Sequence, residues 1–310
     1  MKPEILVTSQ MPAPTMRSLD ENFILHKLFE AKDREAFLAG IKDKVRAIAG
    51  GKGASAALMD ALPKIEIIAN FGVGYDAVDV PAAVARKIPV TNTPDVLTDD
   101  VADLALALLL DAARMISRAD RFVRAGQWLK GNHPLGRAIA GKKLGIVGLG
   151  RIGAAIATRA EAFKLEVSWH GPRPKPDAKW PYVADLVALA RDVDFLCIIC
   201  PLTPQTFHLV TREVIEALGP EGTLINVARG PVVDEAALVD ALKTGKLGHA
   251  ALDVFEAEPK VPEALFAMEN TVLLPHQGSA TIETRTAMGQ LVVDNLLAHF
   301  AGKPLLTRVA

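Results

Sequence analysis

The sequence has few cysteines, few aromatic residues and almost no net charge. The two cysteines, Cys197 and Cys200, stand three residues apart in an apolar run typical of a buried strand, so their side chains face opposite sides of a sheet. That placement argues against a shared disulfide or metal and favours two small buried hydrophobic residues. The net charge of −1, from 35 basic and 36 acidic residues, indicates neither nucleic acid nor an anionic membrane as a partner.

Long hydrophobic runs are also missing. Residues 1–7 lack the apolar core of a signal peptide and predict a first strand instead. The most apolar predicted helix, residues 101–115, contains Asp103, Asp111 and Arg114 and is shorter than the ~20 apolar residues that span a bilayer. No cluster of His, Cys or acidic residues has metal-ligand spacing. We therefore expect a cytoplasmic protein without a bound metal.

Residues 144–153 form a glycine-rich turn between a predicted strand and a predicted helix. Gly148, Gly150 and Gly153 have the spacing G-x-G-x-x-G, which we call the glycine fingerprint. In such a turn the first glycine permits a sharp bend, the second lets a pyrophosphate approach the backbone, and the third lets the helix pack closely on the sheet. The free N–H groups at the start of the helix then face the anion. The fingerprint predicts a dinucleotide site.

The predicted elements alternate between strands and helices, which is typical of α/β proteins, and the length favours two domains. In the first hundred residues the patterns predict strands at 5–8, 45–49, 65–69 and 90–92, and helices at 16–31, 55–62 and 78–86. In the second half they predict strands at 144–147, 166–169, 195–199, 223–226, 250–253 and 272–274.

A break at Pro94 and Asp95 precedes a long apolar helix, and a last helix over 282–300 is expected to return to the first domain. We therefore predict two Rossmann-like, doubly wound domains. Residues 1–98 and 285–310 would form a discontinuous substrate domain. Residues 99–284 would form a central dinucleotide-binding domain.

Polar residues follow three predicted strands of the second domain. Arg229 comes after the strand at 223–226, Glu258 follows the next strand, and His276 follows the last one. Ligands of open parallel sheets bind beyond the carboxyl ends of the strands, so these three side chains can converge on one crevice.

Together with the glycine fingerprint, three segments resemble the D-isomer-specific 2-hydroxyacid dehydrogenases, and specifically their glyoxylate/hydroxypyruvate reductase branch. The segments are N-V-A-R-G from Asn226, D-V-F-E-A-E-P from Asp253 and P-H-Q-G-S from Pro275. They occur in the family's order, and the resemblance runs from about residue 65 to residue 284. It implies a catalytic trio of Arg229, Glu258 and His276.

The resemblance extends to the substrate and cofactor contacts. Val73 and Gly74 match the family's carboxylate-binding loop, and Asp253 matches the acid near the nicotinamide. Arg229 and His276 would contact the substrate as well. The implied cofactor contacts are Gly148, Gly150, Arg151, Ile152, Gly153, His170, Arg173, Pro201, Val227, Ala228, Arg229, Asp253, His276 and Gly278.

The chemistry of 2-oxo acid reduction supports these roles independently. The reaction leaves a developing alkoxide at C2, and a protonated His276 can neutralise it by donating a proton. Glu258 would orient the imidazole ring and favour its charged form. Arg229 presents a planar fork that suits a carboxylate and can polarise the carbonyl. Backbone N–H groups at Val73 and Gly74 can hold the same carboxylate, because glycine permits close approach.

The residues after the second strand of the predicted dinucleotide-binding domain favour NADP over NAD. NAD enzymes usually carry an acid there, ~20 residues beyond the fingerprint, that binds the ribose hydroxyls. Residues 169–173 are W-H-G-P-R, without an acid, and Arg173 can pair with a 2′-phosphate while His170 lies nearby. We therefore expect NADPH as the cofactor, with NAD as the weaker alternative.

The sequence thus predicts an NADPH-preferring reductase that converts glyoxylate, hydroxypyruvate or a similar small 2-oxo acid to a D-2-hydroxy acid. An NAD-dependent D-3-phosphoglycerate or D-lactate dehydrogenase is the alternative within the family. A nucleotide-sensing, corepressor-like binding protein is a more distant one. The resemblance also implies a homodimer, formed through the long helix after Asp99 and the segment up to Gly141.

Overall fold

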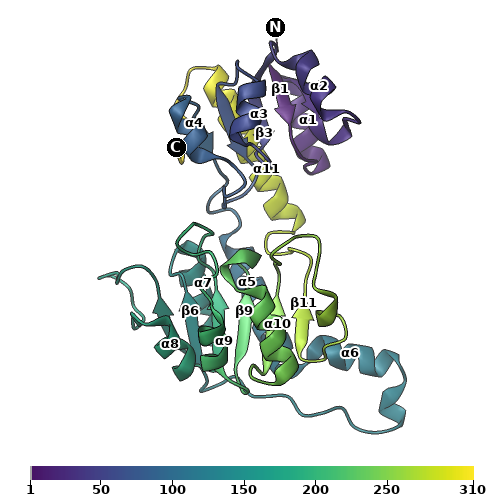
Figure 1. Cartoon of the computed structure of the whole chain (residues 1–310), viewed down its shortest axis with the longest axis vertical. Coiled ribbons are helices and arrows are strands. Elements are labelled where there is room, and N and C mark those ends of the chain that lie inside the picture. Colours follow the sequence, from purple (N-terminus) through teal and green to yellow (C-terminus); the bar gives the residue numbers. More distant parts are fainter. Residues whose placement is uncertain (1) are drawn as a thin grey trace. The chain divides into compact units, whose positions relative to one another are not determined.

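The computed structural model describes residues 2–310, which form two compact units (Figure 1). Unit 1 runs to Leu97 and resumes at Ala280–Ala310, and unit 2 is Thr98–Ser279. The sequence predicts the second boundary after residue 284, a few residues later. The chain joins unit 1 earlier because α11 (Ile282–Phe300) is anchored there from its first turn: the Thr284 hydroxyl donates to the Val96 carbonyl at 3.2 Å.

Unit 1 is a parallel five-stranded sheet with the strand order β2-β1-β3-β4-β5. Its strands are β1 Glu4–Val7, β2 Ile24–Lys27, β3 Val45–Gly50, β4 Ile67–Asn70 and β5 Val90–Thr91. Successive strand residues enter opposite cores: Leu6 packs with the helices α2 (Arg34–Ile41) and α3 (Ala56–Ala61), whereas Val7 packs with α1 (Ala13–Asn22) and α11. A further short helix, α4, covers Val80–Ala85.

The helix predicted over 16–31 is wrong in its second half. The helix α1 ends at Asn22, Ile24–Lys27 form the edge strand β2, and Leu28–Glu30 form the 3-10 helix η1. The strand is defined by its parallel pairing with β1, in which Ile24 lies opposite Glu4. Tertiary pairing therefore overrides the local hydrophobic pattern at this edge.

Unit 2 is a parallel six-stranded sheet with the order β11-β10-β9-β8-β6-β7. All six predicted strands are present, each within one residue of its predicted ends: β6 Lys143–Val147, β7 Glu166–His170, β8 Phe195–Ile198, β9 Thr223–Asn226, β10 His249–Leu252 and β11 Thr271–Leu273. The fold class predicted from the sequence, two doubly wound α/β domains, is confirmed.

Helices cover the sheet of unit 2, and short helices lie in its loops. Three helices share one hydrophobic core: α8 (Leu186–Asp192), α9 (Arg212–Leu218) and α10 (Glu235–Thr244). The long helix α5 (Thr98–Arg114) packs against α7 (Arg151–Ala162), as Figure 1 shows. The remaining elements are α6 Ile116–Arg124 and the 3-10 helices η2 Gln127–Leu129, η3 Gly230–Val232 and η4 Glu263–Leu265.

The strand order of unit 2 locates its crevice. Strand β6 lies between β7 and β8, so the chain leaves β6 in one direction and later returns to its other side. Such a switch point opens a crevice at the carboxyl ends of the two central strands, where dinucleotides bind. The glycine fingerprint follows β6 directly and therefore stands at this switch point.

The sequence predicts that the two cysteines share neither a disulfide nor a metal, and that no helix spans a membrane. Cys197 and Cys200 are free and buried, and burial raises the pKa of the Cys197 thiol to about 12, so it stays protonated. Among the described residues, no helix is both long and apolar enough to cross a membrane.

Candidate active site

The glycine fingerprint has the geometry of a phosphate cradle. Gly148 has a φ of +105°, and a Cβ there would lie 2.8 Å from the Cys200 backbone. A Cβ on Gly153 would lie 2.1 Å from the Gly148 carbonyl oxygen. Around Gly150, by contrast, a Cβ would meet nothing within 4 Å. The first and third glycines are therefore required for packing, and the second leaves open space at the start of α7.

The start of α7 lacks any side chain that competes with an anion. Gly150 is the N-cap, no side chain caps the helix, and its first turn holds no acidic residue. The backbone N–H groups of Arg151, Ile152 and Gly153 belong to this first turn, where intrahelical acceptors are missing. An uncapped helix N-terminus with a partial positive charge fits a pyrophosphate.

A hollow of about 750 Å³ adjoins the fingerprint, and the loop after β7 forms its other wall. In this loop Arg173 is exposed and the Lys175 ammonium donates to the Leu149 carbonyl. The His170 ring is held through Nδ1 by the Val183 carbonyl at 3.0 Å. The residues lining the hollow are Leu149, Gly150, Arg151, Ala154, Lys175, Pro176, Asp177, Ala178, Lys179 and Trp180.

The loops after β8 and β9 are fixed by side chains that bond their own backbone. The Thr206 hydroxyl donates to the Pro201 carbonyl at 2.7 Å. The Asn226 amide oxygen accepts from the N–H of Ala228 at 3.0 Å, and its nitrogen donates to the Arg229 carbonyl at 3.0 Å. The half-buried Arg229 side chain donates from Nη1 to the Ala228 carbonyl at 2.8 Å. These bonds hold in place the two loops that carry Pro201, Val227, Ala228 and Arg229.

Asp253 organises the loop that carries His276. Its buried carboxylate accepts from the N–H of Gln277 at 2.6 Å and from that of Gly278 at 2.8 Å. Its carbonyl accepts from the His276 N–H at 2.9 Å. Burial raises the pKa of Asp253, and the two N–H donors oppose that shift. Asp253 therefore holds three successive residues of this loop.

His276 and Glu258 are brought together by this loop and the one after β10. The His276 ring nitrogen Nδ1 lies 2.8 Å from Glu258 Oε2. Glu258 Oε1 accepts from the Phe255 N–H at 3.3 Å. His276 has a φ of +56°, in the left-handed region that non-glycine residues seldom adopt and that is enriched at functional sites. Because Glu258 binds Nδ1, Nε2 is the ring nitrogen that can exchange a proton with a substrate.

The turn of Arg229 lies directly against the loop of Glu258. A Cβ on Gly230 would stand 1.9 Å from the Phe255 carbonyl carbon and 2.3 Å from the Glu256 nitrogen. Only glycine fits between these two stretches of backbone. The loops of the predicted trio are thus neighbours at the carboxyl edge of one sheet.

The predicted carboxylate-binding loop belongs to unit 1 and is shaped by two buried asparagines. Asn70 Nδ2 donates to the carbonyls of Gly72 and Gly74, both at 3.0 Å, and Asn92 Nδ2 donates to that of Val73 at 3.0 Å. In a trans peptide the C=O and the next N–H point in opposite directions. Holding the carbonyls of residues 72 and 73 therefore turns the N–H groups of Val73 and Gly74 away from the two asparagines.

Comparison with known proteins identifies the family. Residues 106–278 match the family described as D-isomer specific 2-hydroxyacid dehydrogenase, NAD binding domain. The chain belongs to this family. It is 51% identical over 307 residues to a hydroxyphenylpyruvate reductase of Plectranthus scutellarioides, with 98% of each chain covered. It is 48% identical, with the same coverage, to a glyoxylate/hydroxypyruvate reductase of Arabidopsis thaliana.

A solved relative of this dehydrogenase has the same fold. The NADPH-dependent glyoxylate/hydroxypyruvate reductase of Sinorhizobium meliloti, crystallised with NADP and malonate, matches with a TM-score of 0.93 and 47% identity. The match covers 100% of this chain and 97% of the relative. The present chain is accordingly an oxidoreductase with a nicotinamide dinucleotide cofactor, and its open, uncapped fingerprint fits one.

Three residues of the dehydrogenase that shape these sites were not predicted from the sequence. Lys175 is a second cation beside Arg173, and it is found only because the loop after β7 folds back on the fingerprint. Asn70 and Asn92 orient the loop of Val73 and Gly74 through contacts that no local spacing reveals. Among residues 2–310, no group of three or more His, Cys, Asp or Glu side chains is arranged to hold a metal ion.

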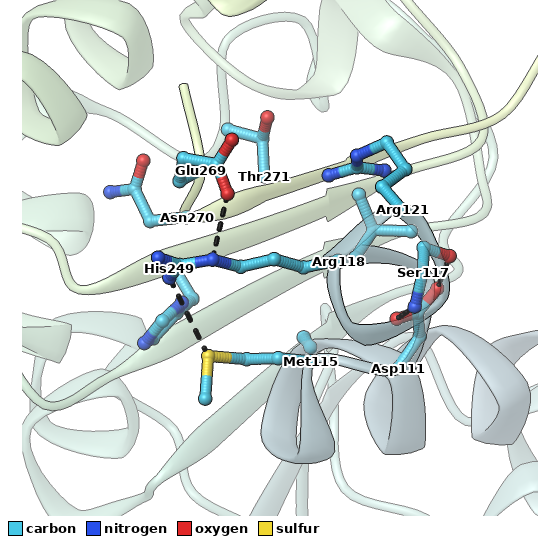
Figure 2. Close-up of a pocket in the computed structure, with 11 residues that line it drawn as sticks. Asp111, Met115, Ser117, Arg118, Arg121, His249, Glu269, Asn270 and Thr271 are labelled. Atoms are coloured by element: carbon cyan, nitrogen blue, oxygen red, sulfur yellow. Dashed lines mark hydrogen bonds and ion pairs between the residues drawn. The ribbon is translucent and has the colours of Figure 1, made fainter. Parts of the chain in front are cut away.

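A second, small hollow lies at the amino ends of the strands of unit 2. It measures about 20 Å³ and lies between α5, α6 and the amino ends of β10 and β11, as Figure 2 shows. Arg118 crosses it and pairs with Glu269 at 2.7 Å. Asp111 accepts from the Ser117 N–H at 2.8 Å. Burial and the nearby arginines lower the pKa of His249 in its wall, which favours the neutral ring. The Arg118–Glu269 ion pair spans this hollow, which lies at the amino ends of the strands, opposite the fingerprint.

Proposed function

We propose that this dehydrogenase is an NADPH-preferring reductase of glyoxylate, hydroxypyruvate and similar small 2-oxo acids, which it converts to D-2-hydroxy acids. The observation that carries the proposal is the 2.8 Å pair of His276 and Glu258 beside the turn of Arg229, at the carboxyl edge of a dinucleotide-binding sheet. The names of the Arabidopsis and Sinorhizobium relatives support the substrate class.

His276 acts as the proton donor in this proposal. The bound cofactor supplies the hydride. Glu258 holds Nδ1–H and stabilises the imidazolium, so Nε2–H can donate to the oxygen that gains charge at C2. Arg229 holds the substrate carboxylate through its planar fork and draws electron density from the carbonyl. Val73 and Gly74 of unit 1 keep the role that the family resemblance implies, which is to bind a substrate carboxylate through their backbone N–H groups.

The preference for NADPH rests on the loop after β7. Arg173 and Lys175 supply two cations there, and no acid stands at the end of β7 to repel a 2′-phosphate. The NADPH dependence of the Sinorhizobium relative supports the same choice. His170 would lie against the ribose, and Pro201 would border the adenine side.

A homodimer formed through α5, α6 and the segment up to Gly141 is part of the proposal. This segment carries Trp128, Leu129 and Leu135, which are 67%, 94% and 95% exposed. Such exposure of large apolar side chains supports an interface there. The cytoplasmic location stays a prediction.

Turnover assays test the function and its alternatives together. The purified protein is given NADPH or NADH with glyoxylate, hydroxypyruvate, 4-hydroxyphenylpyruvate, pyruvate or 3-phosphohydroxypyruvate, and the chirality of the product is determined. We expect the highest kcat/KM with NADPH and one of the first two acids, and a D product. A preference for pyruvate or for the phosphorylated acid with NADH would replace the proposal by one of the alternative dehydrogenases. Absence of turnover would favour a binding protein.

Removing the cation at position 173 is expected to change the cofactor preference. Arg173→Ala should lower the ratio of kcat/KM with NADPH to kcat/KM with NADH by about ten- to a hundredfold, because a charged hydrogen bond to phosphate contributes about 1.5–3 kcal/mol. The matched control is Arg191→Ala, which removes an exposed arginine at the end of α8. Equal kcat/KM values for the two cofactors in the unmodified enzyme would contradict the assignment.

Loss of the Asn70 donors is expected to weaken substrate binding. Asn70→Asp keeps the shape of the side chain but cannot donate to the carbonyls of Gly72 and Gly74, so the N–H groups of the loop lose their orientation. We expect KM for glyoxylate to rise about tenfold, equivalent to ~1.4 kcal/mol, with KM for NADPH unchanged. Asn22→Asp, which removes an amide donor to a carbonyl in α1, is the control. An unchanged KM for glyoxylate would show that the loop does not bind substrate.

A further inference from the structure

Two successive N–H groups of the loop after β10 bond two different carboxylates. The Phe255 N–H donates to Glu258 Oε1 at 3.3 Å, and the Glu256 N–H donates to Glu235 Oε1 at 2.9 Å. Glu258 contacts His276 through its other oxygen. The peptide unit held by Glu235 is therefore the immediate neighbour of the one that seats Glu258.

Glu235 is well placed to hold this peptide. It is the first residue of α10, and the preceding Asp234 caps that helix by accepting from the Ala237 N–H at 2.9 Å. Its side chain is half-buried, and burial together with the nearby Glu256 carboxylate raises the pKa of Glu235. An oxygen acceptor is present in either protonation state, so the bond to the loop does not require the charge.

The same peptide is also restrained from other directions. Gly230 stands where any Cβ would collide with the backbone of Phe255 and Glu256. The Glu256 carboxylate lies 3.3 Å from Nε2 of His208, in the loop after β8. Two titratable side chains thus interact with the Glu256 carboxylate, Glu235 from α10 and His208 from the loop after β8. Of these restraints, Glu235 alone bonds the backbone N–H of Glu256.

We propose that Glu235 is a positioning residue of the reductase, which fixes the Phe255–Glu256 peptide and through it the Glu258 carboxylate against His276. The inference rests on the proposed function, because it assigns Glu235 to the proton-donating pair. Glu235 does not touch the substrate. It acts by keeping Glu258 where the imidazolium needs its partner.

The test compares three substitutions at position 235. Glu235→Ala removes the acceptor, and Glu235→Asp withdraws it by one methylene while keeping the charge at the helix N-terminus. Both are expected to lower kcat for glyoxylate reduction about five- to tenfold, the effect of one lost hydrogen bond. Both should also shift the falling limb of the pH–rate profile to lower pH, because the imidazolium loses part of its stabilisation. Glu235→Gln keeps an acceptor oxygen in place and should restore kcat and the limb.

A readout without turnover separates this inference from the proposed function. The pH titration of the His276 ring signals, followed by NMR in cofactor-free enzyme, should move to lower pH in Glu258→Gln and part of the way in Glu235→Ala and Glu235→Asp. Glu213→Ala, which removes an exposed first-turn acid of α9, should leave it unmoved. A shift in Glu258→Gln without any shift in the Ala and Asp variants overturns the role of Glu235. Full activity of a His276 variant overturns the proposed function instead, and leaves the titration result standing.

Discussion

The substitution His276→Gln is expected to lower kcat for glyoxylate reduction by about 10²–10⁴-fold while NADPH still binds. Glutamine occupies similar space and can still contact Glu258, but it cannot deliver a proton to the developing alkoxide. Stopped-flow or steady-state absorbance at fixed pH gives kcat, and calorimetry gives the Kd for NADPH. The two quantities separate loss of chemistry from loss of the cofactor site.

A second histidine–carboxylate pair provides the matched control for this result. In unit 1 the His299 ring lies 3.2 Å from Glu66, a pair that resembles His276–Glu258 but stands outside the proposed site. His299→Gln should leave kcat within about twofold, since surface pairs contribute little. A loss in His276→Gln smaller than tenfold would remove His276 from the role of proton donor.

The pH dependence of the rate tests the partner of His276. Reduction needs the imidazolium, so its rate should fall as the pH rises, and oxidation of the D-hydroxy acid should show the opposite trend. Glu258→Gln removes the negative charge 2.8 Å from Nδ1 and stops favouring the charged ring. The falling limb for reduction should therefore move to lower pH. A limb that stays in place would mean that another group stabilises the imidazolium.

The parts of the fold that the sequence predicts well are those whose signals are local. The glycine fingerprint and the strands of unit 2 each depend on a few consecutive residues. Arg229, Glu258 and His276 could be proposed together because each follows a strand, and parallel strands end at one edge. The 2.8 Å contact of Glu258 with His276 fits that expectation.

The features that the sequence does not predict arise from contacts between distant segments. Strand β2 exists because Ile24–Lys27 pair with β1, although the same residues suit a helix. Asn70, Asn92 and Glu235 look like ordinary polar residues until the fold brings a backbone carbonyl or N–H to each of them. These contacts decide where the residues around the site point, and no spacing along the chain encodes them.

A substitution that keeps the positive charge at position 229 is still expected to lose most of the activity. Arg229→Lys should lower kcat/KM for every 2-oxo acid by about 10²–10³-fold, the loss typical when a well-placed donor to a developing charge is removed. A lysine ammonium is a point charge that cannot bind a carboxylate through two parallel N–H groups, and it is more strongly hydrated than a guanidinium.

The structure holds the backbone around Arg229 in a fixed position. Arg229 is half-buried, its backbone carbonyl is held by Asn226, and Gly230 is locked against the Glu258 loop. A lysine at this position therefore cannot move its backbone to recover the lost contact. The Kd for NADPH should stay nearly unchanged, and Arg212→Lys in α9, which keeps an exposed pair with Asp240, should have no effect on kcat/KM. If Arg229→Lys raised KM for one acid only, the residue would recognise that acid's side chain. A uniform loss across glyoxylate, hydroxypyruvate and pyruvate is the outcome that assigns Arg229 to the carboxylate and carbonyl these acids share.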